Sequence, residues 1–309
     1  MDHALRTIDC VAIGEILVDM ISKEYVDSLD GATEFSLKVG GSPANMAGNL
    51  ARLGRRVEFI GTVGDDGAGK LIRSELSKVG VDLQYLSTDV RPSSLILVTK
   101  SHNLPAFSAY RSADVQIVTD QFAKLNFAQV RLLHTTAFGL SKEPARSSIL
   151  NAAKEARALG VQLSIDANYA KKIWPDRQEA QSIIEHYLSL GALAKFSEVD
   201  FERLYDRKVV DPEEVGRELL TKGASLVCLT LGEAGAYIFT ADTSHHIPSR
   251  KLNVVDTTGA GDAFWAGFLH GWLSDEKDLE KCGLTGRRLA EMKLTTHGPL
   301  PNRINLVSD

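Results

Sequence analysis

The stretch Asn253-Val-Val-Asp-Thr-Thr-Gly-Ala-Gly-Asp262 leads directly into the apolar run Ala263-Phe-Trp-Ala-Gly-Phe-Leu-His-Gly-Trp272. This order predicts a strand end, a glycine-rich turn and then a buried helix. The first backbone N–H groups of a helix have no partner within it and lie at the positive end of its dipole. The sequence therefore predicts an anion site over Gly259, Ala260 and Gly261, where the two glycines, which have no Cβ atom, let a phosphate approach the backbone.

Asp262 is the informative residue of this turn. A carboxylate would repel a bound phosphate if anion binding were its only task. It is consistent with a general base that accepts a proton from a hydroxyl group, which then attacks the phosphate. We expect the helix dipole to keep this carboxylate ionised at neutral pH. The alternative is a plain N-terminal helix cap, a position where Asp is common.

A second glycine-rich segment, Gly40-Gly-Ser-Pro-Ala-Asn45, precedes the helical pattern Met46–Leu53. Its paired glycines would let a ligand press against the backbone, and Asn45 offers both a donor and an acceptor. The alternative is a turn with an Asn near the start of a helix.

A third segment, Gly64–Lys70, has the G-x-x-x-x-G-K spacing of a phosphate-binding P-loop. The next residue is Leu71, where a P-loop has a Ser or Thr for magnesium. We therefore interpret this segment as a loop that opens a helix from about Ala68 to Lys78, and a P-loop nucleoside triphosphatase is not favoured.

Short apolar runs alternate with helical patterns along the chain, which indicates an α/β fold with a mostly parallel sheet covered on both faces. Two segments, Thr33–Val39 and Ser94–Thr99, break this alternation and predict a small separate sheet. We predict one domain over 1–309, with the small sheet formed by excursions at approximately 15–40 and 92–115. The predicted buried strands include 11–13, 57–60, 131–134, 161–165 and 226–230, and helices are expected around 46–53 and 149–156.

Charge and composition narrow the classes of partner. The net charge is −5 and no basic run is present, so nucleic acid is not expected to bind. The three cysteines match neither a disulfide framework nor a zinc spacing. No apolar stretch approaches the length of a membrane span, and the first residues lack the pattern of a signal peptide. We expect a cytoplasmic protein that binds small molecules.

The two glycine-rich segments, in this order, resemble the PfkB, or ribokinase-like, carbohydrate kinase family over essentially the whole chain. The resemblance implies a three-layer α/β/α domain with a small β lid over a sugar, and ATP, Mg²⁺ and a candidate K⁺ as cofactors. A homodimer through the lid is also expected. Supporting matches are Val11-Ala-Ile-Gly-Glu15 with Asp19, Gly61-x-x-Gly-Asp-Asp66, Tyr110-Arg-Ser-Ala-Asp114, Asp166-x-Asn-Tyr169 with Trp174-Pro175, and Thr230-x-Gly-x-x-Gly235.

The resemblance also implies roles for individual residues. Asp262 is the expected catalytic base, with Gly259, Ala260 and Gly261 as the anion hole over the γ-phosphate of ATP. The expected sugar contacts are Asp19, Gly40, Gly41, Asn45, Arg111 and Asn168. The expected nucleotide contacts are Lys195, Ser197, Thr230, Gly232 and Gly235. Asp200 is expected to reach Mg²⁺ through water, and Asp256 is a candidate ligand of a monovalent cation.

Among the subfamilies, bacterial fructokinases are the most similar, so fructose is the expected substrate. The alternatives are a kinase of 2-keto-3-deoxygluconate or of 5-dehydro-2-deoxygluconate, or a ribokinase-fold binding protein with weakened catalysis. The family usually has Arg where this chain has Ala170, although Lys171 or Lys172 could compensate. The family's Asn-x-x-Glu motif is Ser197-Glu-Val-Asp200 here. The loss of positive charge at Ala170 favours a neutral sugar.

Overall fold

The computed structural model describes residues 6–101, 107–274 and 278–306. Parts of the predicted domain, residues 1–5, 102–106, 275–277 and 307–309, lie outside the described residues. Residues 102–106 belong to the second predicted excursion.

The described part of the chain contains a nine-stranded sheet in the order β13-β12-β11-β10-β9-β8-β1-β4-β5. Neighbouring strands from β11 to β5 are parallel, whereas β12 and β13 are antiparallel at one edge. The carboxyl ends of the parallel strands therefore meet at one edge, where such sheets bind ligands. The strands are β1 (Ile8–Ile13), β4 (Val57–Gly64), β5 (Leu86–Asp89), β8 (Val130–Thr136), β9 (Gln162–Asp166), β10 (Leu193–Ser197), β11 (Leu226–Thr230), β12 (Ala236–Phe239) and β13 (Ser244–Ile247).

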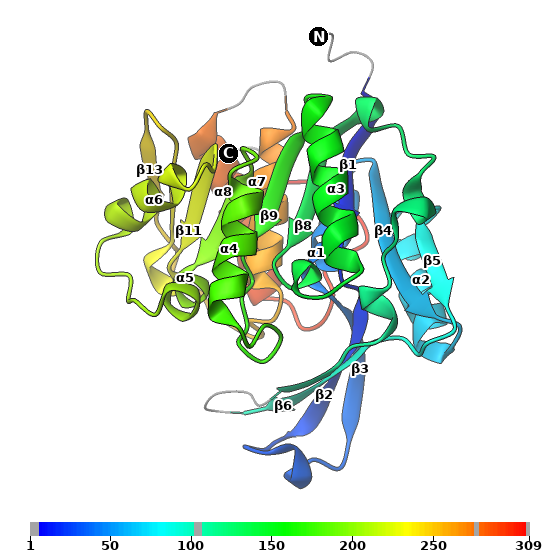
Figure 1. Cartoon of the computed structure of the whole chain (residues 1–309). Helices are drawn as coiled ribbons and strands as arrows, with labels where there is room; N and C mark the ends of the chain where they lie inside the picture. Colours follow the sequence, from blue (N-terminus) through cyan, green and yellow to red (C-terminus); the bar gives the residue numbers. More distant parts are fainter. Residues whose placement is uncertain (1–5, 102–106, 275–277, 307–309) are drawn as a thin grey trace.

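Helices cover both faces of this sheet (Figure 1). In β1, Val11 and Ile13 pack into the core on one face, while Cys10 and Ala12 pack into the core on the other. A strand buried on both sides is continuously apolar, which explains why its sequence shows no alternation. The first face carries α3 (Ala145–Ala158), α4 (Arg177–Leu188), α5 (Glu198–Tyr205) and α6 (Pro212–Thr221), and the second carries α1 (Ser42–Arg52), α2 (Gly67–Lys78), α7 (Ala260–Trp272) and α8 (Leu279–Leu294). The predicted three-layer α/β/α fold is confirmed.

A four-stranded sheet in the order β3-β2-β6-β7 projects from this body (Figure 1). Its strands are β2 (Leu17–Tyr25), β3 (Phe35–Gly40), β6 (Leu95–Lys100) and β7 (Phe107–Tyr110). The two segments that broke the α/β pattern fall on β3 and β6. Strand β2 was not predicted, because its buried residues, Leu17, Val18 and Ser22, follow no regular alternation.

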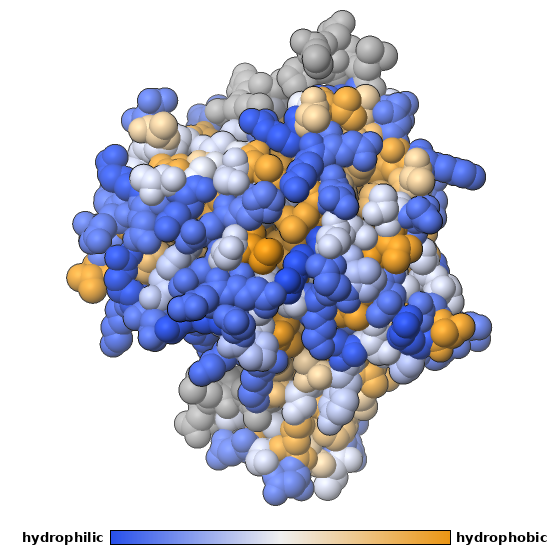
Figure 2. Space-filling view, in the orientation of Figure 1, coloured by the Kyte–Doolittle hydropathy of each residue, from blue (hydrophilic) through white to orange (hydrophobic). Residues whose placement is uncertain are grey.

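Hydrophobic residues gather on the small sheet in the view of Figure 2. Tyr25, Leu37 and Tyr110 of this sheet are exposed. Such a surface suits contact with another subunit, and pairing through this sheet stays a prediction. Within the described ranges, no helix has the length and apolar character needed to cross a bilayer.

Helix α7, which begins with the glycine-rich turn, packs closely against α8. A Cβ atom on Gly267 of α7 would lie 2.8 Å from the Cα atom of Gly286 in α8. A Cβ atom on Gly286 would lie 2.7 Å from the carbonyl oxygen of Phe264. Distances this short leave no room for a side chain, so the two glycines set the position of α7 and of the turn at its start.

We expect Gly267→Ala to force α7 and α8 apart and to lower the free energy of unfolding by about 1–3 kcal/mol. Gly67→Ala is the control, because a Cβ atom at this first residue of α2 has nothing within 4 Å. Urea unfolding should show the control within about 0.5 kcal/mol of the wild type. Equal stability of the two variants would contradict the close packing.

Candidate active site

A cavity of about 1470 Å³ lies between the carboxyl ends of the parallel strands and the small sheet. Single small-molecule sites usually measure roughly 300–1,000 Å³, so this cavity has room for two ligands. The predicted site residues that line it are Asp19, Gly41, Asn45, Asn168, Lys195, Ser197, Asp200, Thr230, Gly232, Gly235, Gly259, Ala260, Gly261 and Asp262. Segments far apart in the sequence therefore converge on one site. Gly40, Arg111 and Asp256 are not among the lining residues.

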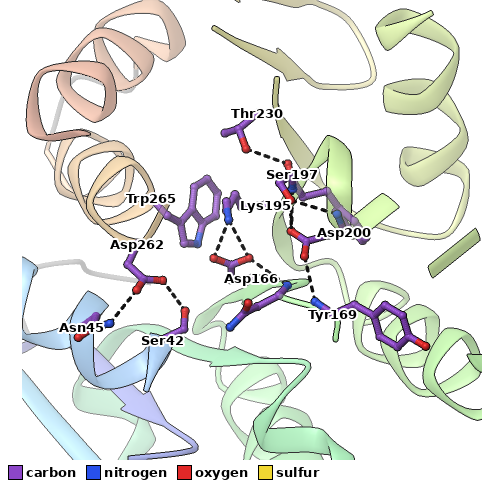
Figure 3. A network of polar contacts seen from close by, with 12 residues as sticks. Ser42, Asn45, Asp166, Tyr169, Lys195, Ser197, Asp200, Thr230, Asp262 and Trp265 are labelled. Atoms are coloured by element: carbon purple, nitrogen blue, oxygen red, sulfur yellow. Dashed lines mark hydrogen bonds and ion pairs between the residues drawn. The ribbon is translucent and has the colours of Figure 1, made fainter. Parts of the chain in front are cut away.

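Asp262 lies in the first turn of α7. The helix begins directly after Gly259, which has a left-handed backbone conformation with a φ of 76°. The Ser42 hydroxyl donates to Asp262 Oδ1 over 2.6 Å, and Asn45 Nδ2 donates to Oδ2 over 2.9 Å (Figure 3). Both donors belong to the first turn of α1. The starts of two helices therefore hold this carboxylate, and each of its oxygens keeps a free lone pair.

Burial raises the pKa of Asp262 above its ordinary value of 3.8, although the hydrogen bonds from Ser42 and Asn45 and the charge of Lys195 lower it. The loss of hydration opposes the charged form more strongly than these contacts support it. That the carboxylate is ionised at neutral pH stays a prediction. A carboxylate with a raised pKa is a stronger base once it is ionised.

A buried ion pair lies beneath the glycine-rich turn. Lys195 Nζ of β10 lies 2.9 and 3.1 Å from the two carboxylate oxygens of Asp166, at the end of β9. A Cβ atom on Gly261 would lie 3.1 Å from this ammonium group, so the backbone of the turn packs directly against the positive charge. Burial disfavours the charged form of Lys195, but the neighbouring carboxylates of Asp166 and Asp200 outweigh it and raise the pKa.

Asp200 lies at the opposite side of this ion pair, in the first turn of α5. Its Oδ2 accepts hydrogen bonds from the N–H and hydroxyl of Ser197, and its Oδ1 accepts from the N–H of Tyr169. Among the described residues, no group of three or more carboxylates, histidines or cysteines could hold a metal ion. This arrangement fits a Mg²⁺ ion held mainly by phosphate and water, with one carboxylate nearby.

Asp19 and Gly40 meet where the small sheet joins the main body. A Cβ atom on Gly40 would lie 2.2 Å from Asp19 Oδ2, so only glycine leaves room for this carboxylate. Burial, followed by the nearby negative charge of Asp262, raises the pKa of Asp19 to about 6, against the influence of Lys38. Gly40 therefore acts on the site indirectly, because it leaves space for the Asp19 side chain, which lines the cavity.

Gly41 and Asn168 both have a positive φ, a backbone conformation that most residues avoid. Gly41 has a φ of 100°, and a Cβ atom there would lie 2.5 Å from the carbonyl oxygen of Glu15. Asn168 has a φ of 30°, and its N–H donates to Asp166 Oδ1. Positive φ at a residue other than glycine is uncommon, and such strain often lies at functional sites.

Arg111 lies outside the cavity lining, in an ion pair with the buried carboxylate of Asp114 at 2.6 Å. Its guanidinium also donates to Phe138 O and to the Ser141 hydroxyl, and lies over the Phe138 ring. Phe138 itself lines the cavity. The described contacts thus give Arg111 a role in supporting the cavity wall, and its direct contact with a sugar stays a prediction.

Asp256 lies in a second, smaller cavity of about 410 Å³ on the other side of the turn. The ammonium groups of Lys38 and Lys293 each lie 3.5 Å from Asp256 Oδ2. Although burial opposes it, hydrogen bonds from Thr258 and these two lysines lower the pKa of Asp256 to about 2. Two like charges about 4 Å apart repel by about 4 kcal/mol near a protein surface. A bare monovalent cation therefore does not fit beside this carboxylate.

Sequence reasoning gave no role to several residues of the site, among them Ser42, Glu15, Lys38 and Lys293. Ser42 is part of the glycine-rich segment Gly40–Asn45, but Ser is so common at helix starts that it gave no separate signal. Glu15 is buried, which raises its pKa to about 8, and its carboxylate accepts from Thr136 and from the N–H of Ser42. Lys38 and Lys293 carry no local signal, because their partner lies far along the chain.

The comparisons with known proteins agree with this geometry. The family described as pfkB family carbohydrate kinase matches residues 7–304. The chain is 34% identical to the ATP-dependent 6-phosphofructokinase of Thermoanaerobacterium thermosaccharolyticum, covering 88% of this chain and 84% of that protein.

Two solved fructokinases are similar in structure. One, from Halothermothrix orenii, is 33% identical, with a TM-score of 0.80 over 91% of this chain and 98% of that chain. The other is a double mutant from Vibrio cholerae O395 in a form with fructose, ADP and potassium ion bound. It is 27% identical, with a TM-score of 0.81 over 95% of this chain and 94% of that chain. The match along almost the whole chain, together with the site around Asp262, shows that this protein belongs to the PfkB family of carbohydrate kinases.

Proposed function

We propose that this chain transfers the γ-phosphate of ATP to a hydroxyl group of fructose, with Asp262 as the general base. The observation that carries the proposal is the position of Asp262, at the start of α7 in the wall of a cavity large enough for two ligands. Its carboxylate is held by Ser42 and Asn45 and has a raised pKa. An acceptor hydroxyl beside it would lose its proton as it attacks the phosphate.

The phosphate would bind at the glycine-rich turn. The N–H of Ala260 donates to the carbonyl oxygen of Thr257 over 3.2 Å, but the positive end of the α7 dipole still favours an anion at the turn. The Lys195 ammonium behind Gly261 adds a fixed positive charge. Phosphoryl transfer depends mainly on positioning and on the stabilisation of charge. This intact arrangement favours a working kinase over a ribokinase-fold protein with weakened catalysis.

The nucleotide would occupy the half of the cavity bordered by Ser197, Thr230, Gly232 and Gly235. The cavity is lined by basic side chains, which suit the charge of a triphosphate, and also by Glu198, Glu233 and Glu291. When bound, Mg²⁺ neutralises charge on the β- and γ-phosphates, and Asp200 would hold it through water. The basic lining residues other than Lys195 are Arg203, Arg250, Lys251 and Arg287.

The sugar would occupy the half of the cavity next to the small sheet. Asp19, Asn45 and Asn168 offer polar groups to several hydroxyls, and apolar side chains such as Phe107 and Phe138 enclose them. Among the described residues that line this half, none is Lys or Arg. The position usually held by Arg in this family is Ala170, and this charge distribution supports a neutral sugar.

Neither lysine after Ala170 lines the cavity. Lys172 Nζ instead donates to the carbonyl oxygen of Phe107 over 2.8 Å and lies against that ring. This contact occupies one of the two lysines that could replace the missing charge. The proposal therefore stays with fructose rather than with an acidic or phosphorylated sugar.

We expect Asp262→Asn to lower kcat by at least ~10²-fold, because the amide cannot accept the hydroxyl proton. The amide has nearly the shape of the carboxylate, so ATP binding and the melting temperature should change little. Asp211→Asn is the matched control, since Asp211 caps α6 by accepting from the Glu213 N–H. Steady-state kinetics measures kcat for both variants and for the wild type. If both variants keep near wild-type kcat, Asp262 is only a helix cap.

We expect a kcat/KM for fructose at least tenfold above those for fructose 6-phosphate and 2-keto-3-deoxygluconate, a difference of about 1.4 kcal/mol. The physical reason is the absence of a positive charge among the described lining residues of the sugar half. Ala170→Arg should narrow this gap by restoring a charge near the acidic group. A coupled assay of ADP release measures all three sugars, and a wild-type preference for either anionic substrate would show that the substrate assignment is wrong.

A further inference from the structure

Beside the anion-binding turn, the Asp256 carboxylate is in contact with lysines from two other parts of the molecule. Lys38 comes from β3 of the small sheet, and Lys293 comes from the last turn of α8. Both ammonium groups lie 3.5 Å from Asp256 Oδ2, while the N–H of Thr258 donates to Oδ1 over 2.9 Å. The carboxylate at the entrance to the turn is therefore neutralised by the protein itself.

Lys293 is held firmly at the base of this turn. The N–H groups of Val255 and Asp256 donate to the carbonyl oxygen of Leu294, which ties the segment before the turn to the end of α8. The Lys293 stem passes below Gly259, where a Cβ atom would lie 3.8 Å from its Cε. Its side chain is 13% exposed, against 39% for Lys38, so Lys293 is the better fixed of the two charges.

The surroundings of Lys293 attract a cation. The negative end of the α8 dipole lies at its last turn, and Asp256 adds a full negative charge. These two features, close to the turn that is proposed to bind phosphate, favour a cation at this position. The Lys293 ammonium already supplies the positive charge, and Lys38 supplies a second from the small sheet.

We propose that the ammonium group of Lys293, supported by that of Lys38, takes the place of a monovalent metal cation beside the anion-binding turn, so that this kinase needs no potassium. The inference rests on the proposed role of Gly259, Ala260 and Gly261 in binding the γ-phosphate. The charge is built into the chain, and its position beside Asp256 does not depend on the salt of the medium.

Turnover in two salts tests this directly. The wild type should phosphorylate fructose at the same rate in potassium chloride as in tetramethylammonium chloride of equal ionic strength. Lys293→Met keeps most of the side-chain volume but removes the charge, so its rate in tetramethylammonium should fall at least ~10-fold. Potassium should then restore much of this loss, because the remaining lysine, Lys38, is the more exposed of the two and its side chain has room to turn away from Asp256.

Lys222→Met is the matched control. Lys222 also lies at the C-terminal end of a helix, α6, and pairs with a carboxylate, Glu185, at 3.1 Å. Its variant should behave like the wild type in both salts. Asp262→Asn should be slow in both salts, so loss of the catalytic base is distinguishable from loss of the built-in charge.

Thermal unfolding tests the same claim without turnover, and so does not depend on the identity of the sugar. Potassium should raise the melting temperature of Lys293→Met above its value in tetramethylammonium, and should leave the wild type unchanged. Potassium activation of the wild type would overturn the proposal. A Lys293→Met variant that is fully active without potassium, or one that potassium neither stabilises nor restores, would also overturn it.

Discussion

The site depends on one carboxylate that is buried where two helices begin. Asp262 lies in the first turn of α7, and its oxygens accept hydrogen bonds from Ser42 and Asn45 in the first turn of α1. A buried charge without hydrogen bonds is costly, so α1 and α7 must keep this relative position. The same burial raises the pKa of Asp262 and makes it a better base. Stability and reactivity are therefore set by one contact.

Two lysines flank the glycine-rich turn on opposite sides. Lys195 lies behind Gly261 and pairs with Asp166, while Lys293 lies below Gly259 and pairs with Asp256. Each ammonium group is balanced by a carboxylate, which limits the cost of burying it. The turn thus combines the positive end of a helix dipole with fixed positive charges. Its position in turn follows from the close approach of α7 to α8 at Gly267 and Gly286.

The sequence predicted the fold and the centre of the site, because these depend on local patterns. The turn before α7 combines a strand end, glycines and an apolar run, and it identified Asp262 without any long-range information. The contacts of Lys38 and Lys293 depend on the register of β3 and the length of α8, which no local pattern reports. The direction of the pKa shift of Asp262 could not be predicted, because burial causes it and the degree of burial cannot be inferred from sequence.

The pH dependence of kcat in Ser42→Ala tests the central claim most directly. The Ser42 hydrogen bond lowers the pKa of Asp262, so its removal should raise that pKa further. Because the base must be ionised to act, the acid limb of the kcat profile should move to higher pH, while the rate on the alkaline plateau changes much less. Asp19 has a pKa of about 6, raised in part by the charge of Asp262. A less ionised Asp262 would lower the pKa of Asp19, so a limb set by Asp19 would not move to higher pH. An acid limb that does not move in Ser42→Ala would contradict the assignment of Asp262 as the base.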